Sequence, residues 1–349
     1  MREIKSRRQG PPKAALEAQR AEAGPGPRDG NSGMSSHPSY PLAGKREHPR
    51  PIVLTRPDNI SRAKIGLALG FIGMCMFAGT LPATRLAVAG FDPFFLTVIR
   101  AAIAGTSGLV VIVLTKRKLP PRELWSEFFL ATFFTVVCFP LSVALAMMTL
   151  PAAHGGVVLG ILPLATAAAA VIFAHERPSV GFWVVGIIGA GIVLTFVYRQ
   201  GSGDGFFIAD LFLLGTVVSG AIGYTLSGRL TARMPGWEVI SWQVVICLPL
   251  SLVATLVLWP ADITNVPLLP WLGLGYVSFV SQYTAFFVFN AALAMGGIAR
   301  VGQVMLLQPF VIVGLALPVN KEPIQLDTIL FAAAVVATVL IGQRMRIRR

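Results

Sequence analysis

One arginine inside a long apolar run is the clearest candidate for chemistry in this chain. Arg100 lies in the run FFLTVIRAAIAG. In a bilayer an unpaired charge costs about 2.5–3.5 kcal/mol on insertion scales, so the guanidinium should face a cavity or a partner. It could anchor a carboxylate or another acidic group. Alternatively, it ties helix-end carbonyls or snorkels to the interface, and Asp92 is a nearby acid that could pair with it.

Hydroxyl and amide side chains in other apolar runs could line the same cavity. The candidate substrate-binding residues are Arg100, Tyr224, Gln243, Ser278, Gln282, Gln303 and Gln308. Ser278 and Gln282 are spaced to share one helical face with Ser281. Each group could instead make a hydrogen bond between helices, worth about 1 kcal/mol or less. Taken together, they predict a polar central cavity.

Catalytic and metal-binding arrangements are missing from the sequence. His154 and His175 are 21 residues apart, about 30 Å along a helix. Neither GxSxG, HExxH nor a Walker loop occurs. The three cysteines lie in separate apolar runs and do not form a CxxC pair. We therefore expect no enzyme activity, no catalytic residue, no metal and no cofactor.

The elements that must position these side chains are membrane-length helices. Hydrophobic residues make up 54% of the 349 residues and charged residues only 13%, with a mean hydropathy of +0.70. A bilayer span needs about 20 apolar residues. Ten such runs are predicted, at 64–84, 94–115, 125–149, 155–174, 180–198, 206–228, 238–259, 270–293, 300–318 and 326–343. The expected fold class is an all-α integral membrane protein.

The termini differ in composition from the apolar part. Residues 1–61 are rich in Pro, Gly, Ser and charge, which predicts a disordered basic tail, although Met34 opens a shorter plausible chain. Residues 344–349 form a basic C-terminus. The net charge of +13 does not indicate nucleic-acid binding, because no such motif accompanies it.

Lys and Arg beside the predicted spans indicate the orientation. With the tail in the cytoplasm, twelve of these residues flank spans on the inside and three on the outside. This bias follows the positive-inside rule. Ten spans then place both termini in the cytoplasm of a cell-membrane protein.

A repeated pattern divides the chain into two halves. Pro163 and Glu176 recur as Pro309 and Glu322, 146 residues later with the same 13-residue interval. The segments GTLPATRL and GYTLSGRL, at 79–86 and 223–230, also align. Five spans per half is an odd number, so the halves 62–198 and 206–343 would be inverted repeats, which suit alternating access.

The two halves do not carry the same polar groups. Gln243 lies near the aligned position of Arg100, which predicts an asymmetric site for one oriented organic substrate. Pro163 and Pro309 lie within spans, where a kink is expected. They are candidate hinges, or inherited bends. Glu176, Arg177 and Glu322 are candidates for a gate or an interfacial ion pair.

The chain resembles the drug/metabolite transporter superfamily, in its ten-helix EamA branch. The resemblance rests on Leu-Pro followed by HERPS, on Gln-Pro followed by KEP, on the arginine of the second span, and on Gly-Arg-Leu ending the sixth. It covers 62–343. The family's usual Gly-Glu-Arg is replaced by His-Glu-Arg and Lys-Glu-Pro, and the first span lacks the frequent Trp. The resemblance implies a secondary carrier, which we expect to export small amino-acid-like or amphipathic metabolites or drugs.

Three alternatives remain open: an uptake carrier, a passive facilitator, and a membrane scaffold or sensor. The expected partners are a small-molecule substrate and the lipid bilayer, and a homodimer is left open.

Overall fold

Helices form almost every described part of the chain. The computed structural model describes residues 58–173, 177–200, 208–296, 304–323, 325–344 and 347–348, all within the unit Leu54–Arg349. The predicted tail lies outside these residues except for 58–61, where the first helix already begins.

The elements before residue 201 include three interrupted helix series, which are α2–α3, α5–η2–α6 and α7–α8. In chain order they are α2 (Asp58–Ala78), α3 (Thr80–Val88), α4 (Pro93–Leu114), η1 (Arg122–Leu124), α5 (Trp125–Thr132), η2 (Phe133–Cys138), α6 (Phe139–Met147), α7 (Ala152–Leu159), α8 (Leu162–Phe173), β1 (Arg177–Pro178) and α9 (Val180–Gln200). η2 is π-helical. α7 and α8 meet at a 43° bend, and Pro163 is the second residue of α8, where its missing N–H leaves no helical bond unmade.

The elements after residue 207 repeat several of these features. In chain order they are α10 (Ile208–Thr231), α11 (Gly236–Val257), η3 (Ile263–Asn265), α12 (Leu268–Gly275), η4 (Tyr276–Thr284), α13 (Ala285–Gly296), η5 (Met305–Leu307), α15 (Gln308–Asn320), α16 (Leu326–Gln343) and β2 (Ile347–Arg348). η4 is π-helical, like η2. Pro309 is the second residue of α15 and follows the single 3-10 turn η5.

Seven described helices or helix series are long and apolar enough to cross a bilayer. They are Lys64–Val88, Pro93–Leu114, Arg122–Met147, Val180–Arg199, Ile208–Thr231, Gly236–Val257 and Leu268–Leu293. The bent pair α7–α8 gives an eighth if it is one span. Met305–Asn320 and Leu326–Gly342 are apolar but shorter, and they coincide with the ninth and tenth predicted runs. The fold is a helical, multi-pass membrane fold.

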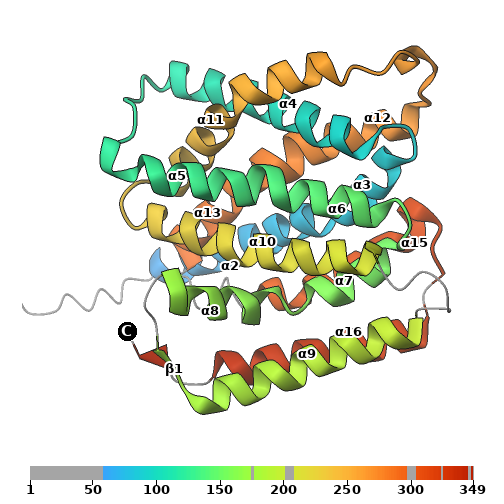
Figure 1. Cartoon of the computed structure of the whole chain (residues 1–349). Coiled ribbons are helices and arrows are strands. Elements are labelled where there is room, and N and C mark those ends of the chain that lie inside the picture. The colour runs from blue at the N-terminus through green and yellow to red at the C-terminus, as the bar shows by residue number, and fades with distance from the viewer. Residues whose placement is uncertain are drawn as a thin grey trace, which may run out of the picture. The chain divides into compact units, whose positions relative to one another are not determined.

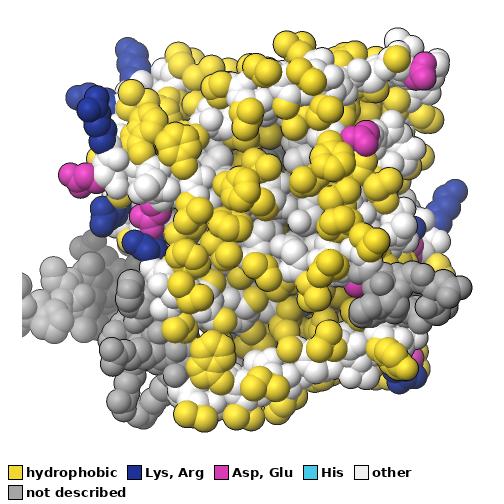
Figure 2. All heavy atoms as spheres, viewed as in Figure 1, with side chains coloured by type: hydrophobic (Ala, Val, Ile, Leu, Met, Phe, Trp, Pro, Cys, Tyr) yellow, Lys and Arg dark blue, Asp and Glu magenta, His cyan; other side chains and the backbone are white. Residues whose placement is uncertain are grey.

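The surface has the pattern that such a fold requires. Hydrophobic side chains cover the face seen in Figure 2, and Lys and Arg side chains gather mainly along one edge. That edge holds the end of α4 and the start of α5 in the same view (Figure 1). Large exposed side chains such as Val113, Leu256 and Ile187 are apolar, so they suit a lipid environment.

Helices pack in pairs that join early and late parts of the chain. α4 packs along α11, and α9 along α16 (Figure 1). α2 and α3 pack on α13 and α12, α10 packs on α5, η2, α6 and α8, and α7 packs on α15. A Cβ on Gly105 of α4 would lie 2.8 Å from the carbonyl oxygen of Val244, so glycine permits the close α4–α11 contact.

One short strand pair lies outside this helical plan. β1 and β2 pair antiparallel, with Arg177 opposite Arg348 and Pro178 opposite Ile347. The expectation of an all-α chain therefore holds for the spans but not for these two-residue strands.

Candidate functional site

Arg100 is deeply buried in α4 and has a single described hydrogen-bond partner. Its side chain is 2% exposed. Nη2 donates a hydrogen bond of 2.8 Å to Oε1 of Gln282 in η4, while the buried Nε has no partner among the described residues. Tyr224 of α10 lies close enough to interact electrostatically with the guanidinium. Elements from both halves of the chain therefore meet at this arginine.

The start of α4 explains the depth of Arg100. Asp92 precedes the helix, and its carboxylate accepts hydrogen bonds from the backbone N–H groups of Phe94 and Phe95, at 2.9 and 3.1 Å. Pro93 fits the first helical turn. Arg100 follows Pro93 by seven residues, about 10 Å of helix. Asp92 is thus a helix cap and does not pair with Arg100, contrary to the alternative considered from sequence.

Gln282 lies in a segment whose helical geometry the sequence did not reveal. η4 is π-helical over nine residues, and such segments are frequent at functional sites. Within it, the hydroxyl of Ser281 hydrogen bonds that of Thr80 in α3 at 2.7 Å. Ser278 donates only to Leu274, one turn earlier, at 2.6 Å. The three side chains predicted to share a face therefore contact three different neighbours.

Gln243 has separate partners. Its Nε2 donates to Oγ of Ser227 in α10 at 2.8 Å, and its backbone carbonyl accepts from Thr132 at 3.3 Å. Gln308 is half-buried at the start of α15. Gln303 lies outside the described residues. The structure therefore brings together Arg100, Gln282 and Tyr224, while the described hydrogen bonds of Gln243 and Ser278 go to other residues.

The prolines lie where α7–α8 and α15 meet. A Cβ on Gly160, at the bend before α8, would be 3.3 Å from Cγ of Pro309. A Cβ on Gly156 would be 2.8 Å from Ile312. Pro163 and Pro309 thus start helices beside discontinuities, and their role as hinges stays a prediction.

An ion pair joins α3 to the end of α15. We call Arg85, Glu322 and the start of α7 the Glu322 cluster. Arg85 Nε lies 3.0 Å from Glu322 Oε1, and Arg85 also donates to the carbonyl of Leu150. The Glu322 carboxylate accepts from the N–H groups of Ala152 and Ala153, at 2.8 and 3.0 Å. A carboxylate at a helix N-terminus is stabilising, so this cluster ties the two halves together.

A second ion pair, the Glu127 cluster, joins α10 to α5. Arg229 Nε lies 2.8 Å from Glu127 Oε1, and Arg229 also donates to the carbonyl of Phe173 at the end of α8. Arg229 aligns with Arg85 in sequence, so each aligned arginine pairs with an acid of the other half. Glu176 lies outside the described residues. Arg177 is described only as backbone in β1, so their predicted pair is not described either.

In a third ion pair, Arg117 lies 3.7 Å from Glu238 and 5.0 Å from the ring centroid of Trp237. This contact joins the end of α4 to the start of α11.

A buried His–Asp pair was missed from sequence. Nε2 of His154 in α7 lies 2.7 Å from Oδ1 of Asp210 in α10, and the imidazole packs against Phe196, with ring centroids 4.8 Å apart. Each residue stands near the start of an apolar run, which suggests only an interfacial position. Their pairing depends on α7 and α10 being neighbours.

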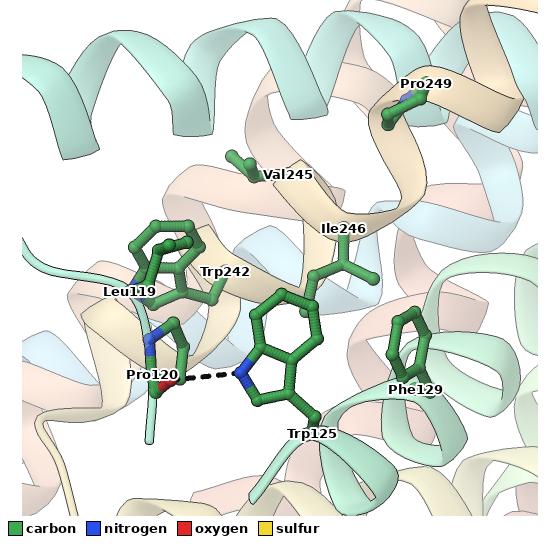
Figure 3. A pocket seen from close by; sticks show the side chains of 8 residues that line it. All are labelled: Leu119, Pro120, Trp125, Phe129, Trp242, Val245, Ile246 and Pro249. Carbon is green, nitrogen blue, oxygen red and sulfur yellow. Dashed lines mark hydrogen bonds between the residues drawn. The ribbon is translucent and has the colours of Figure 1, made fainter. Parts of the chain in front are cut away.

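An apolar pocket of about 230 Å³ lies between α11 and the segment leading into α5 (Figure 3). Its lining residues are Leu119, Pro120, Trp125, Phe129, Trp242, Val245, Ile246 and Pro249. Trp125 Nε1 donates to the carbonyl of Pro120 at 3.0 Å. None of the predicted substrate-binding residues lines this pocket.

Comparisons with known proteins agree with the multi-pass helical fold. The EamA-like transporter family model matches twice, over residues 64–198 and 207–342. The chain is 38% identical over 275 residues to the "Uncharacterized transporter YdeK" of Bacillus subtilis (strain 168), covering 79% of this chain and 96% of that protein. The chain belongs to the EamA-like transporter family and is a multi-pass membrane transporter.

A solved structure supports the fold alone. A protein titled only "Crystal structure of protein" matches with a TM-score of 0.56 and 18% identity, over 81% of this chain and 99% of that one.

Proposed function

We propose that the protein is a secondary carrier of small metabolites that works by alternating access between two inverted five-helix halves, 62–198 and 206–343. The observation that carries this proposal is the Arg100–Gln282 contact, a buried polar site between α4 of one half and η4 of the other. A carrier needs such a site between moving parts, and symmetric halves let it face either side in turn.

Contacts related by the sequence repeat support the inversion. Gly79 and Gly223 align, and each lies against the π-helical segment of the other half. A Cβ on Gly79 would collide with the hydroxyl of Tyr276, and one on Gly223 would lie 2.5 Å from Oγ1 of Thr135. The pairing of α2–α3 with α12–α13 likewise has its counterpart in the pairing of α10 with α5–α6.

Ion pairs between the halves are candidates for the gates. The Glu322 cluster and the Glu127 cluster each join an arginine of one half to an acid of the other. Alternating access would break one cluster while the other stays closed. We propose ten spans, with α15 and α16 as the last two, and both termini in the cytoplasm.

A topology experiment tests the span count. A reporter fused after Arg349 should read cytoplasmic, because ten spans return the chain to its starting side. The same reporter placed in the segment between α9 and α10 is the matched control and should read external. An external signal at the C-terminus would contradict the ten-span arrangement.

A metabolite comparison tests transport itself. Cells with the gene, without it and with the Arg100→Ala variant are compared by untargeted analysis of medium and cell extract. The family resemblance favours export, so we expect metabolites to accumulate in the medium only with the unaltered gene. Accumulation in the cells instead would indicate uptake. Saturable counterflow in proteoliposomes would distinguish a carrier from a passive facilitator, and no gene-dependent metabolite in either fraction would contradict metabolite transport.

A further inference from the structure

Arg100 differs from the other charged side chains that are buried or partly buried in the described structure. Four acids there each face a basic side chain: Glu322 with Arg85 at 3.0 Å, Asp210 with His154 at 2.7 Å, Glu127 with Arg229 at 2.8 Å and Glu238 with Arg117 at 3.7 Å. Arg100 has no such acid. In the described part of the chain, the titratable side chain close enough to interact electrostatically with it is the hydroxyl-bearing Tyr224.

A neutral amide is a weak substitute for a counter-charge. Gln282 supplies one oxygen to Nη2, while a guanidinium carries five N–H donors. A charge held away from water is strongly unfavourable unless it is paired and hydrogen-bonded. The site therefore retains the capacity to bind an anion.

The unused donor fits a carboxylate. Nε and one Nη of a guanidinium form a fork that matches the two oxygens of a carboxylate. Nε of Arg100 is buried and has no partner among the described residues, while the only described hydrogen bond from the Nη atoms goes to Gln282. A carboxylate on this edge would take Nε and share or displace the contact with Gln282.

A single arginine also limits the charge of the bound group. A phosphate monoester carries a charge near −2 at neutral pH, so one of its charges would stay unpaired beside Arg100. A carboxylate carries one charge and is matched by one guanidinium.

We propose that Arg100 is the anchor for a carboxylate-bearing, singly negative substrate, and that Gln282 accepts a hydrogen bond from the guanidinium when no substrate is bound. This deepens the proposed function and rests on it. A cationic substrate would be repelled from the same position, and a neutral one would leave the charge uncompensated.

A substitution that adds a negative charge tests whether Arg100 lacks a counter-charge, and it requires no knowledge of the substrate. Gln282→Glu places a carboxylate beside the Arg100 guanidinium. The unfolding temperature of the purified full-length variant should therefore be roughly 2–4 °C above that of the unaltered protein. Gln243→Glu is the matched control: it places the same change opposite Ser227, with no arginine partner described, and should lower the unfolding temperature. Equal lowering by both variants would show that Arg100 already has a counter-charge, and this would overturn the proposal.

The metabolite comparison tests the chemical class. Metabolites whose level in the medium depends on the gene should carry a carboxylate, and Gln282→Glu should reduce their export roughly 10- to 100-fold, as expected for losing a charged hydrogen bond. Ser251→Ala is the control, because Ser251 Oγ donates only to Leu248 of its own helix. Gene-dependent metabolites that are cationic or uncharged would overturn the proposed class. If no metabolite depends on the gene, the carrier function fails, and the unfolding comparison still decides whether Arg100 lacks a counter-charge.

Discussion

Arg100 and Gln243 occupy matched places in the two halves but have different surroundings. Each is seven residues from the first residue of its helix, Pro93 in α4 and Gly236 in α11, and the two helices pack against each other. Arg100 reaches η4 of the other half, whereas Gln243 bonds to Ser227 in the neighbouring α10. The two halves therefore share a helical framework but differ in the polar side chains that it carries.

The largest expected effect separates these two residues in function. Arg100→Ala should reduce transport of the gene-dependent metabolites by about 100-fold or more, because a charged contact is lost from the site. Membrane abundance should stay near normal, because the variant also removes a buried charge. Gln243→Ala loses one neutral hydrogen bond, costing about 1 kcal/mol of stability, and should leave transport close to that of the unaltered protein.

Intact transport by Arg100→Ala would remove Arg100 from the binding site. An equal loss in both variants would instead favour a site that spans the matched positions.

A smaller effect separates the two ion-pair clusters. Glu322→Ala should lower the free energy of unfolding by about 3 kcal/mol, because it leaves a partly buried Arg85 and two helix N–H groups without their partner. Glu127→Ala should cost less than about 1 kcal/mol, because the side chain of its partner Arg229 is 44% exposed and solvent weakens the pair. Denaturation of the two purified variants measures the difference. Equal losses in the free energy of unfolding would contradict a larger contribution of the Glu322 cluster to stability.

The smallest effect concerns the aligned glycines. Gly79→Ala and Gly223→Ala should each destabilise the protein by about 1–2 kcal/mol, because a methyl group would press on Tyr276 in one half and on Thr135 in the other. Similar costs, measured by thermal unfolding, would support equivalent packing in the two halves. Gly228→Ala is the control, since a Cβ there meets nothing within 4 Å. A cost in only one half would show that the repeat does not preserve this contact.

Much of the fold follows from the sequence, because long apolar runs have few alternatives in a bilayer. Each predicted span overlaps a described helix, and seven described helices or helix series are long and apolar enough to cross a bilayer. The need of Arg100 for a polar partner was also predictable, because a charge in an apolar run has a cost that local sequence already reveals.

The partners across the helices were not predictable. The prediction for Ser278 and Gln282 assumed α-helical spacing, and the π-helical η4 changes which neighbour each residue reaches. Alignment placed Gln243 opposite Arg100, but a shared position in two halves does not mean a shared cavity. The pairing of His154 with Asp210 required α7 to lie beside α10, and no local pattern specifies that contact.

The two π-helical segments have a mechanical consequence. A π-helical stretch holds more residues per turn than the α-helix on either side of it. If that surplus residue passes along the span, each side chain it passes would rotate by about 100° around the axis, the angle per residue of an α-helix. Gln282 would then swing away from Arg100 while most of the span's backbone hydrogen bonds persist. The side chains of η4 would thus change the neighbours that they contact by rotation about the helix axis, without unfolding of the span.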